Sequence, residues 1–432
     1  LVKTTVNANL ASYPLDYRRF RRVLLAGALM CVFMLTLSVV LHEEAQVAYS
    51  WLEFRDDETP EDECQCEKVI QGDVEEIGRA KVLTITKNFK NKTHISDKSY
   101  IELTNDCEVF RTTRKYLPLP LSEEEEAFPV AYSIVVHHKV QNFERLLRSI
   151  YAPQNFYCIH VDKKAPKSFK TAIDSIVSCF DNVFIASQLE KVIYASWSRV
   201  QADINCMRDL LQISSNWKYF INLCGQDFPI KTNLEIVRAL KALGGGNSLE
   251  TEVMPHNKEA RWKKSYRMVR DKIQKTNQDK KPPPLGIKIF SGGAYIVVSR
   301  AYVRFVLEDP KAQALISWSN DTYSPDEFLW ATMQRIPEVP GYLRANSKYD
   351  ITDIFTISRL IKWAGHEGAL DAVYPPCQGT HVRAVCVYGA GDLQWMLEQR
   401  HLFANKFDTD FDPIAIRCLE KYLRHRALIK QH

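Results

Sequence analysis

Residues 130–161 read VAYSIVVHHKVQNFERLLRSIYAPQNFYCIHV and carry the clearest signal of the architecture. The first seven of them, 130–136, form a continuous apolar run of the kind found in strands buried on both faces. Apolar residues then recur at helical spacing over 143–151, and a second apolar run follows at 156–161. The stretch therefore predicts a strand, a helix and a second strand.

The same alternation continues toward the C-terminus. We expect further strands at 183–186, 219–223 and 289–299, and further helices at 168–180, 197–211 and 233–243. Strands that alternate with helices predict an α/β fold with a mostly parallel sheet flanked by helices. Ligands of such sheets bind beyond the carboxyl ends of the strands, which are occupied here by His137, Asp162 and Asp227.

Two glycines and a polar stretch interrupt this pattern. The pair Gly292-Gly293 breaks the strand expected at 289–299, and a glycine pair lets a ligand or another backbone approach closely. Residues 271–288 are polar and contain three consecutive prolines, which predicts a surface loop.

The overall composition is that of a globular protein. Hydrophobic residues make up 46% and charged residues 25% of the 432 residues, which excludes wholesale disorder. The net charge is +5, and residues 1–41 account for +4 of it, with five Lys or Arg against one Asp. The remaining +1 does not supply the basic stripe that nucleic-acid binding needs, so no nucleic-acid partner is expected.

Residues 23–41, VLLAGALMCVFMLTLSVVL, form an uncharged run between four arginines and two glutamates. Such a run just spans about 30 Å of hydrocarbon, and the positive-inside rule places the arginines in the cytosol. We expect a cytosolic tail at 1–22, a transmembrane signal-anchor helix at 23–41, a lumenal stem at 42–127 and a catalytic domain at 128–432. A cleaved signal peptide is the alternative for 23–41, and the acidic residues 42–80 lack helical or strand periodicity.

Ten of the eleven cysteines follow residue 41, as expected of a body that folds in an oxidising compartment. No C-x-x-C pair is present, so a zinc ribbon is not expected. The N-x-T sequons at Asn91 and Asn320 fit N-glycosylation in the secretory pathway.

The segment 323–327, YSPDE, has two interpretations. Ser324 and Glu327 have the spacing of a capping box around a helix start, with Pro325 at the first helical position. In the other interpretation, Asp326 or Glu327 presents a carboxylate as general base for a sugar hydroxyl, since a helix N-terminus favours the anion.

Positive charge for a departing diphosphate could come from a metal or from cationic side chains. Asp162 and Asp227, at the ends of predicted strands, each lack a second acidic residue two positions away, so neither strand end carries a D-x-D metal motif and no metal is expected. Arg383 and Lys406 are the candidate cations instead. The basic run 261–264 fits a membrane or nucleic-acid patch or a carbohydrate cleft, and Trp363 fits either a sugar platform or the core.

Six segments together carry a specific resemblance. The chain resembles the core 2 β-1,6-N-acetylglucosaminyltransferase family (glycosyltransferase family 14), Golgi enzymes that branch mucin-type O-glycans, from about residue 66 to the C-terminus. The segments are AYSIVVH (131–137), YCIHVD (157–162), YASWSRV (194–200), YSPDE (323–327), VYGAGD (387–392) and FANKFD (403–408).

The resemblance implies a GT-A-like fold in a single-pass type II protein of the Golgi membrane. It also implies metal-independent, inverting transfer from UDP-GlcNAc to Galβ1,3GalNAc on mucin-type glycoproteins, with Glu327 as the base. The implied donor-binding residues are Val135, Val136, His137, Asp162, Lys163, Lys164, Tyr194, Arg383 and Lys406. The implied acceptor-binding residues are Glu250, Lys258, Arg261, Glu327 and Trp363. The implied disulfides are Cys66–Cys418, Cys107–Cys179, Cys158–Cys206 and Cys377–Cys386.

One departure from the family leaves the acceptor range open. Gly365 stands where the leukocyte-type enzymes have an acceptor-contacting tyrosine, and the stretch around it is closer to the mucin-type member with broader acceptors. The alternatives are therefore core 2, core 4 and I-branching activity in one enzyme, a related xylosyltransferase, or a membrane-tethered lectin without catalysis. Cys64 has no partner in the family pattern and is a candidate for a disulfide-linked homodimer.

Overall fold

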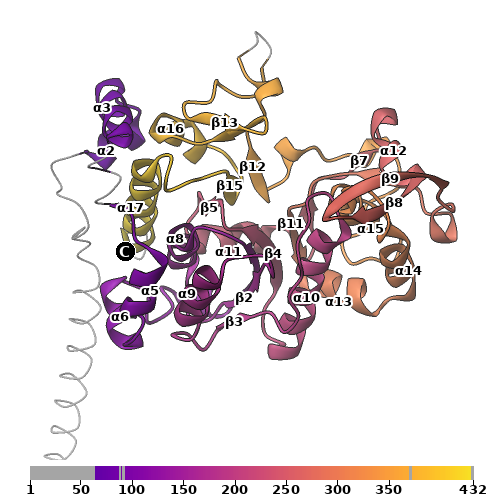
Figure 1. The fold of residues 1–432 in the computed structure, drawn as a ribbon, viewed down its shortest axis with the longest axis horizontal. Coiled ribbons are helices and arrows are strands. Elements are labelled where there is room, and N and C mark those ends of the chain that lie inside the picture. The colour runs from indigo at the N-terminus through magenta and orange to yellow at the C-terminus, as the bar shows by residue number, and fades with distance from the viewer. Residues whose placement is uncertain (1–63, 87–88, 90–92, 369–371, 430–432) are drawn as a thin grey trace, which may run out of the picture. The chain divides into compact units, whose positions relative to one another are not determined.

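The predicted alternation of strands and helices is present in the computed structural model of the chain (Figure 1). The structure describes residues 64–86, 89, 93–368 and 372–429. The predicted tail at 1–22, the predicted membrane span at 23–41 and the sequon at Asn91 lie outside these residues.

The central sheet has six strands in the order β3-β2-β1-β4-β11-β6. The first four are parallel, and the register places Val136 beside Val161 and Val135 beside Cys224, so their carboxyl ends share one edge. β11 runs antiparallel to both β4 and β6. The six strands are β1 (Val130–Val136), β2 (Phe156–Val161), β3 (Val183–Ile185), β4 (Tyr219–Cys224), β6 (Ser248–Leu249) and β11 (Ile296–Ser299).

The predicted fold class is wrong as stated. The fold is mixed α/β, because antiparallel strands complete the central sheet and smaller sheets accompany it. The predicted membrane helix is also not shown: none of the helices among the described residues is long and apolar enough to cross a bilayer. The longest of them, α10 (Trp197–Ile213) and α17 (Pro413–Ile429), have 17 residues each and carry several charges.

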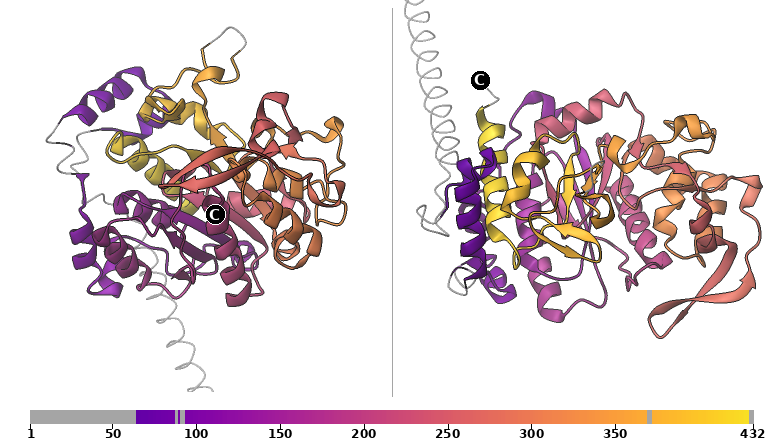
Figure 2. Two further views of the ribbon diagram at one scale, coloured as in Figure 1. Left: turned by 45° about the vertical axis from the view of Figure 1, so that its right-hand side comes forward. Right: turned by 90° about the horizontal axis from the view of Figure 1, so that it is seen from above.

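Helices cover both faces of the central sheet, as the sequence predicted (Figures 1 and 2). Alternate residues of β1 enter different cores: Tyr132 and Ile134 join one cluster, and Ala131 joins the other. The first cluster includes residues of α8 (Val140–Ile150), α9 (Lys167–Val177) and α11 (Asn233–Ala242). The second includes residues of α10, α13 (Arg300–Glu308), α14 (Pro310–Ser319) and α15 (Leu329–Met333).

A third core joins the N-terminal and C-terminal ends of the described chain. It contains residues of α2 (Cys66–Gln71), α3 (Val74–Ile85), α16 (Leu393–Leu397) and α17. α2 and the first part of α3 lie in the stretch 42–80, whose sequence shows no helical periodicity, yet both are helical and pack in this core. Beside this core lie a three-stranded sheet and a hairpin, formed by β12 (Arg359–Ile361), β15 (Phe403–Asn405) and β5 (Asp227–Pro229), and by β13 (Thr380–Val382) and β14 (Val385–Val387).

The predicted surface loop at 271–288 is wrong over its first half. A long two-stranded hairpin, β8 (Lys264–Val269) with β9 (Lys272–Asp279), occupies this region and lies at the outside of the body (Figure 2). The polar composition of these residues gave no sign of the hairpin, because neither of its faces is fully buried. The remaining elements are α5 (Asp97–Leu103), α6 (Cys107–Thr113), α7 (Glu123–Glu126), β7 (Glu252–Val253), α12 (Ala260–Lys263) and β10 (Phe290–Ser291).

The four implied disulfides are present in the structure. They join Cys66 to Cys418, Cys107 to Cys179, Cys158 to Cys206 and Cys377 to Cys386. The first closes a loop of 352 residues, and each such link adds about 2–4 kcal/mol by restricting the unfolded chain. Cys64 is free but buried, so a link between two chains through it would require the third core to open.

A buried ion pair fixes α8 to the segment before the sheet. The Glu144 carboxylate accepts hydrogen bonds from Arg114 Nε (3.1 Å) and Nη2 (2.7 Å) and from the Tyr100 hydroxyl (3.2 Å). Burial raises the pKa of Glu144, but the charges of Arg114 and Arg148 outweigh burial and lower it to about 2. The native state therefore holds this carboxylate charged where an unfolded chain would protonate it.

Replacing Glu144 by Gln should lower the free energy of unfolding by about 3–5 kcal/mol, because buried guanidinium charge loses its partner. Urea unfolding with the disulfides intact measures this, and Glu102→Gln, which breaks an exposed pair with Lys98, should cost less than about 1 kcal/mol. Since the native pKa is lowered, this stabilisation is complete above about pH 4.3 and is lost as the pH falls toward 2. Equal losses in the two variants at neutral pH would contradict the assignment.

Candidate active site

The carboxyl ends of β1 and β2 meet at one edge of the sheet and bring the first group of predicted residues together. The Asp162 backbone N–H donates to Val136 O (2.9 Å), and Asp162 Oδ1 accepts from the backbone N–H of Lys164 (2.8 Å). Val135 and Val136 are buried, and the Val135 carbonyl accepts a hydrogen bond from Gly225 N (3.2 Å). Lys163 is held through its N–H to Glu190 O (3.0 Å).

His137 lies between this edge and the first predicted cation. Burial and the neighbouring His138 lower the pKa of His137 to about 4, and the charges of Lys164 and Arg383 act in the same direction. The ring is therefore neutral at neutral pH. The structure thus brings together His137, Asp162, Lys164 and Arg383, which come from segments more than 200 residues apart in the chain.

Arg383 occupies the tip of the hairpin β13–β14. Arg383 and Ala384 have φ of 54° and 61°, which matches a two-residue hairpin turn of type I′. The turn places the Arg383 guanidinium 5.5 Å from the centre of the Tyr194 ring, whose side chain is 73% exposed. The predicted donor-binding residues Tyr194 and Arg383 are thus in cation–π contact.

Lys406 follows β15 and is attached to the same hairpin. Its backbone N–H donates to Cys386 O (3.2 Å), and its carbonyl accepts from Tyr388 N (2.9 Å). Burial lowers the pKa of Lys406, and the positive charge of Arg383 contributes to the lowering. Two cations that repel each other at a sheet edge favour an anionic ligand between them.

Glu327 ends a short turn, Pro325–Glu327. Ser324 has φ of 46° and its hydroxyl caps nothing, so the capping-box interpretation is wrong. The Glu327 carboxylate instead pairs with Arg261 through Oε2, and it remains about one-third exposed. A carboxylate that is held by a guanidinium and open to solvent has the position that a general base requires.

Backbone hydrogen bonds connect the Glu327 turn to the donor side. The N–H of Ser324 donates to Ala195 O (2.8 Å), directly beside Tyr194, and the N–H of Tyr323 donates to Arg261 O (2.9 Å). On its other side the turn accepts from Gly292 N through Glu327 O (2.8 Å). One hydrogen bond and one cation–π contact therefore link the Glu327 turn to Arg383, through Ala195 and its neighbour Tyr194.

Glu250 and Lys258, two of the predicted acceptor-binding residues, lie near each other, and Glu250 also lies near Glu327. Burial, with the charges of Asp353 and Glu252, raises the pKa of Glu250 to about 7, and Lys258 opposes this shift. Gly293 explains how Glu250 fits, since a Cβ there would lie 2.8 Å from Glu250 Oε2. The glycine pair thus allows another part of the protein, Glu250, to approach closely. Near neutral pH Glu250 can donate a hydrogen bond while Glu327 accepts one.

Trp363 is attached to the cationic hairpin. It forms a β-bridge with Val385, and the N–H of Ala364 donates to Ala384 O (2.9 Å). Its side chain is 40% exposed, as a sugar platform would require. A Cβ at Gly365 would meet no atom within 4 Å, so a bulkier residue at this position would have room. Asn320, the remaining sequon within the described residues, is exposed at the end of α14.

Sequence reasoning missed the role of Arg199; spacing alone left Asp326 and Glu327 as candidates for the base, and only the family resemblance selected Glu327. Arg199 on α10 pairs with Asp203 (2.7 Å) and lies close enough to Asp326 to oppose the burial that raises the pKa of Asp326 to about 6. Asp326 Oδ1 is buried, whereas Glu327 is accessible. Only the quoted run 194–200 hinted at Arg199.

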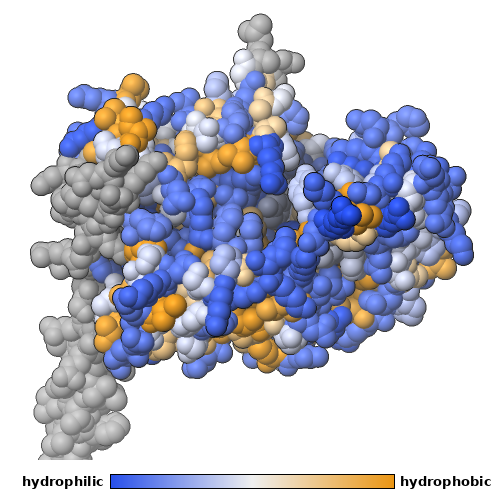
Figure 3. All heavy atoms as spheres, in the orientation of Figure 1, coloured by the Kyte–Doolittle hydropathy of each residue, from blue (hydrophilic) through white to orange (hydrophobic). Residues whose placement is uncertain are grey.

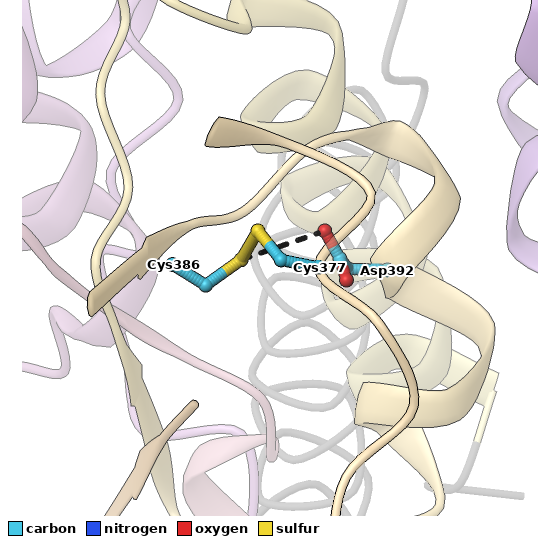
Figure 4. Close-up of side chains that lie close together, drawn as sticks. All are labelled: Cys377, Cys386 and Asp392. Carbon is cyan, nitrogen blue, oxygen red and sulfur yellow. Dashed lines mark hydrogen bonds between the residues drawn. A yellow bond between two sulfur atoms is a disulfide. The ribbon is translucent and has the colours of Figure 1, made fainter. Parts of the chain in front are cut away.

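One group of three metal-ligand residues exists in the described part of the chain, namely Cys377, Cys386 and Asp392. Figure 4 shows that the two sulfur atoms are bonded to each other, with the Asp392 carboxylate beside them. Asp392 accepts hydrogen bonds from Lys362 Nζ (2.8 Å) and Gly389 N (3.0 Å). The disulfide and Asp392 therefore stabilise the hairpin that carries Arg383, and the bonded sulfur atoms offer no thiolate to a metal.

A sheet edge with two neighbouring cations, linked through Tyr194 and Ala195 to a turn that carries an accessible carboxylate, fits a group-transfer enzyme of the α/β class with an anionic leaving group. Residues 130–397 match the Core-2/I-Branching enzyme family, and the chain belongs to that family.

Curated relatives in this family share their name. A Homo sapiens protein named beta-1,3-galactosyl-O-glycosyl-glycoprotein beta-1,6-N-acetylglucosaminyltransferase is 54% identical over 432 residues, 99% of both chains. A Bos taurus protein of the same name is 58% identical over 86% of this chain and 87% of its own. A second Homo sapiens protein, whose name adds the number 3, is 56% identical over 84% of this chain and 83% of its own.

Proposed function

We propose that the chain is a β-1,3-galactosyl-O-glycosyl-glycoprotein β-1,6-N-acetylglucosaminyltransferase. It transfers GlcNAc from UDP-GlcNAc to the C6 hydroxyl of GalNAc in Galβ1,3GalNAc-Ser/Thr and forms core 2 branched O-glycans. The observation that carries the proposal is the hydrogen-bonded connection between the Glu327 turn and the loop that stacks on Arg383, in a chain 54–58% identical to relatives of that name.

The residues divide the reaction between them. Glu327 takes the proton of the C6 hydroxyl, and the oxygen then attacks the anomeric carbon of GlcNAc. The bond to the diphosphate breaks on the opposite side, which inverts the α-linked donor to a β linkage. Arg383 and Lys406 stabilise the charge on the departing UDP. Arg261 holds one oxygen of Glu327 and leaves the other free for the proton.

The reaction should need no metal, because Arg383 and Lys406 supply the positive charge that a divalent ion supplies elsewhere. We expect full transfer from UDP-GlcNAc to free Galβ1,3GalNAc in EDTA, measured by product formation with the full chain. A parallel sample with added Mn²⁺ is the control. Activity that is lost in EDTA and restored by Mn²⁺ would contradict the proposal, and UDP binding without any transfer would favour a lectin.

The open space at Gly365 favours a second candidate, an enzyme that also accepts core 3 and polylactosamine chains. Without a side chain there, the wall beside Trp363 does not select a single acceptor shape. The same assay with GlcNAcβ1,3GalNAc and a polylactosamine acceptor separates the two candidates. Turnover of the first acceptor alone marks a narrow core 2 enzyme, and turnover of several marks a broad one.

We further propose that the enzyme works in the lumen of the Golgi. Four disulfides support an oxidising compartment, and glycoprotein acceptors are found there. A homodimer linked through Cys64 gains no support, because that thiol is buried in the third core.

A further inference from the structure

The segment 261–288, which contains the hairpin β8–β9, concentrates positive charge. It holds ten Lys or Arg against two Asp, a formal charge of +8, whereas the whole chain carries +5. The other residues together are therefore at −3. In Figure 3 strongly hydrophilic side chains cover the region of β8 and β9, around a small apolar patch.

Most of this charge is not neutralised by the protein. Six cationic side chains of the segment are exposed and make no ion pair with the described residues, namely Arg267, Arg270, Lys272, Lys275, Lys281 and Lys288. Like charges at this density repel one another and raise the local concentration of anions. Among these cations on β8, the apolar side chain of Met268 is 47% exposed. Such a mixed surface fits a polypeptide as well as a small ion.

The hairpin borders the candidate active site at both of its ends. At the base, Tyr266 N donates to Asp321 O (2.8 Å), and the Tyr266 ring lies 5.5 Å from the ring of Tyr323 on the segment that leads to Glu327. At the tip, Asp271 Oδ2 pairs with Lys191 Nζ (2.6 Å), three residues before Tyr194. The hairpin therefore connects the segment that leads to Glu327 with the segment that leads to Tyr194.

We propose that the hairpin β8–β9 is a docking surface for an acidic stretch of the acceptor glycoprotein, next to the glycosylated Ser or Thr. The inference rests on the proposed function and adds a polypeptide preference to it. Six residues of strand span about 20 Å, so the ribbon matches an extended acidic segment of roughly six residues. Charge complementarity at the rim of a site acts mainly on association, so the effect lies in kcat/KM and weakens with salt.

Two glycopeptides that differ only in charge test this surface. Both carry Galβ1,3GalNAc on one Thr; the acidic one has four flanking Glu, and the other has Gln at these positions. With the full chain at low salt we expect kcat/KM to favour the acidic glycopeptide about tenfold, and the preference to vanish near about 0.5 M salt. Free Galβ1,3GalNAc is the acceptor without a polypeptide.

A triple variant, Arg267→Gln with Lys272→Gln and Lys275→Gln, should lose most of the preference and keep its activity on the free disaccharide. The matched control removes three exposed lysines elsewhere, Lys68→Gln with Lys98→Gln and Lys348→Gln, and should keep the preference.

Three results would overturn the proposal. Equal use of both glycopeptides by the unaltered chain would remove the docking role while the proposed function stands. A triple variant that loses binding to vesicles containing phosphatidylserine but keeps its glycopeptide preference would assign the hairpin to a lipid surface. No transfer to the free disaccharide would overturn the proposed function and this inference together.

Discussion

Glu327→Gln should lower kcat on free Galβ1,3GalNAc by about 10²- to 10⁴-fold, because an amide cannot take the proton of the attacking hydroxyl. The substitution keeps the shape of the side chain in the turn Pro325–Glu327. UDP affinity should stay within about twofold, because the cations of the donor side are unchanged. Initial rates give kcat, and calorimetric titration with UDP gives the affinity.

The pair with Arg261 requires a separate variant, since Glu327→Gln also weakens that contact. Arg261→Gln should raise KM more than it lowers kcat, because the base remains. Glu259→Gln is the matched control: this carboxylate lies two residues from Arg261 and pairs with Lys263. A Glu327→Gln enzyme that keeps more than about a tenth of its kcat would transfer the role of base to Asp326.

Much of the central sheet could be predicted from the sequence, because its strands are buried on both faces. β1 and β2 begin and end where the apolar runs begin and end, at 130–136 and 156–161. α8 to α11 were predicted within a few residues, since each buries one stripe at helical spacing. The antiparallel β11 was missed as such, because strand direction depends on connections and not on periodicity.

The candidate site was predictable as a set of residues but not as an arrangement. The spacing of Ser324 and Glu327 equally fitted a helix cap, and only the left-handed conformation of Ser324 excludes it. Periodicity also could not reveal the hairpin β8–β9, whose stability comes from cross-strand pairs and its attachment to Asp321. The cysteine pairing came from the family resemblance, because four pairs among many combinations cannot be read from spacing.

Lys406→Met and Arg383→Met should each lower kcat/KM for UDP-GlcNAc by about 10²- to 10³-fold, because each removes a cation from the departing diphosphate. The two effects should not add. Burial and the charge of Arg383 lower the pKa of Lys406 in the free enzyme. Removing Arg383 therefore relieves a repulsion on Lys406 and at the same time removes a contact to the diphosphate, so the two effects are coupled.

A double-mutant cycle measures this coupling through UDP and uridine affinities. Uridine lacks the diphosphate, so its affinity should change little in either variant, whereas UDP affinity should fall in both. Arg400→Gln, an exposed cation that stacks on Phe355 outside the site, is the control and should leave both affinities unchanged. If both variants kept the UDP affinity and kcat of the unaltered chain, other cations would have to stabilise the charge of the leaving group. Lys163 and Lys164, at the end of β2, would then be the next positions to test. The outcome therefore decides whether the tip of the β13–β14 hairpin or the edge of the central sheet carries the diphosphate.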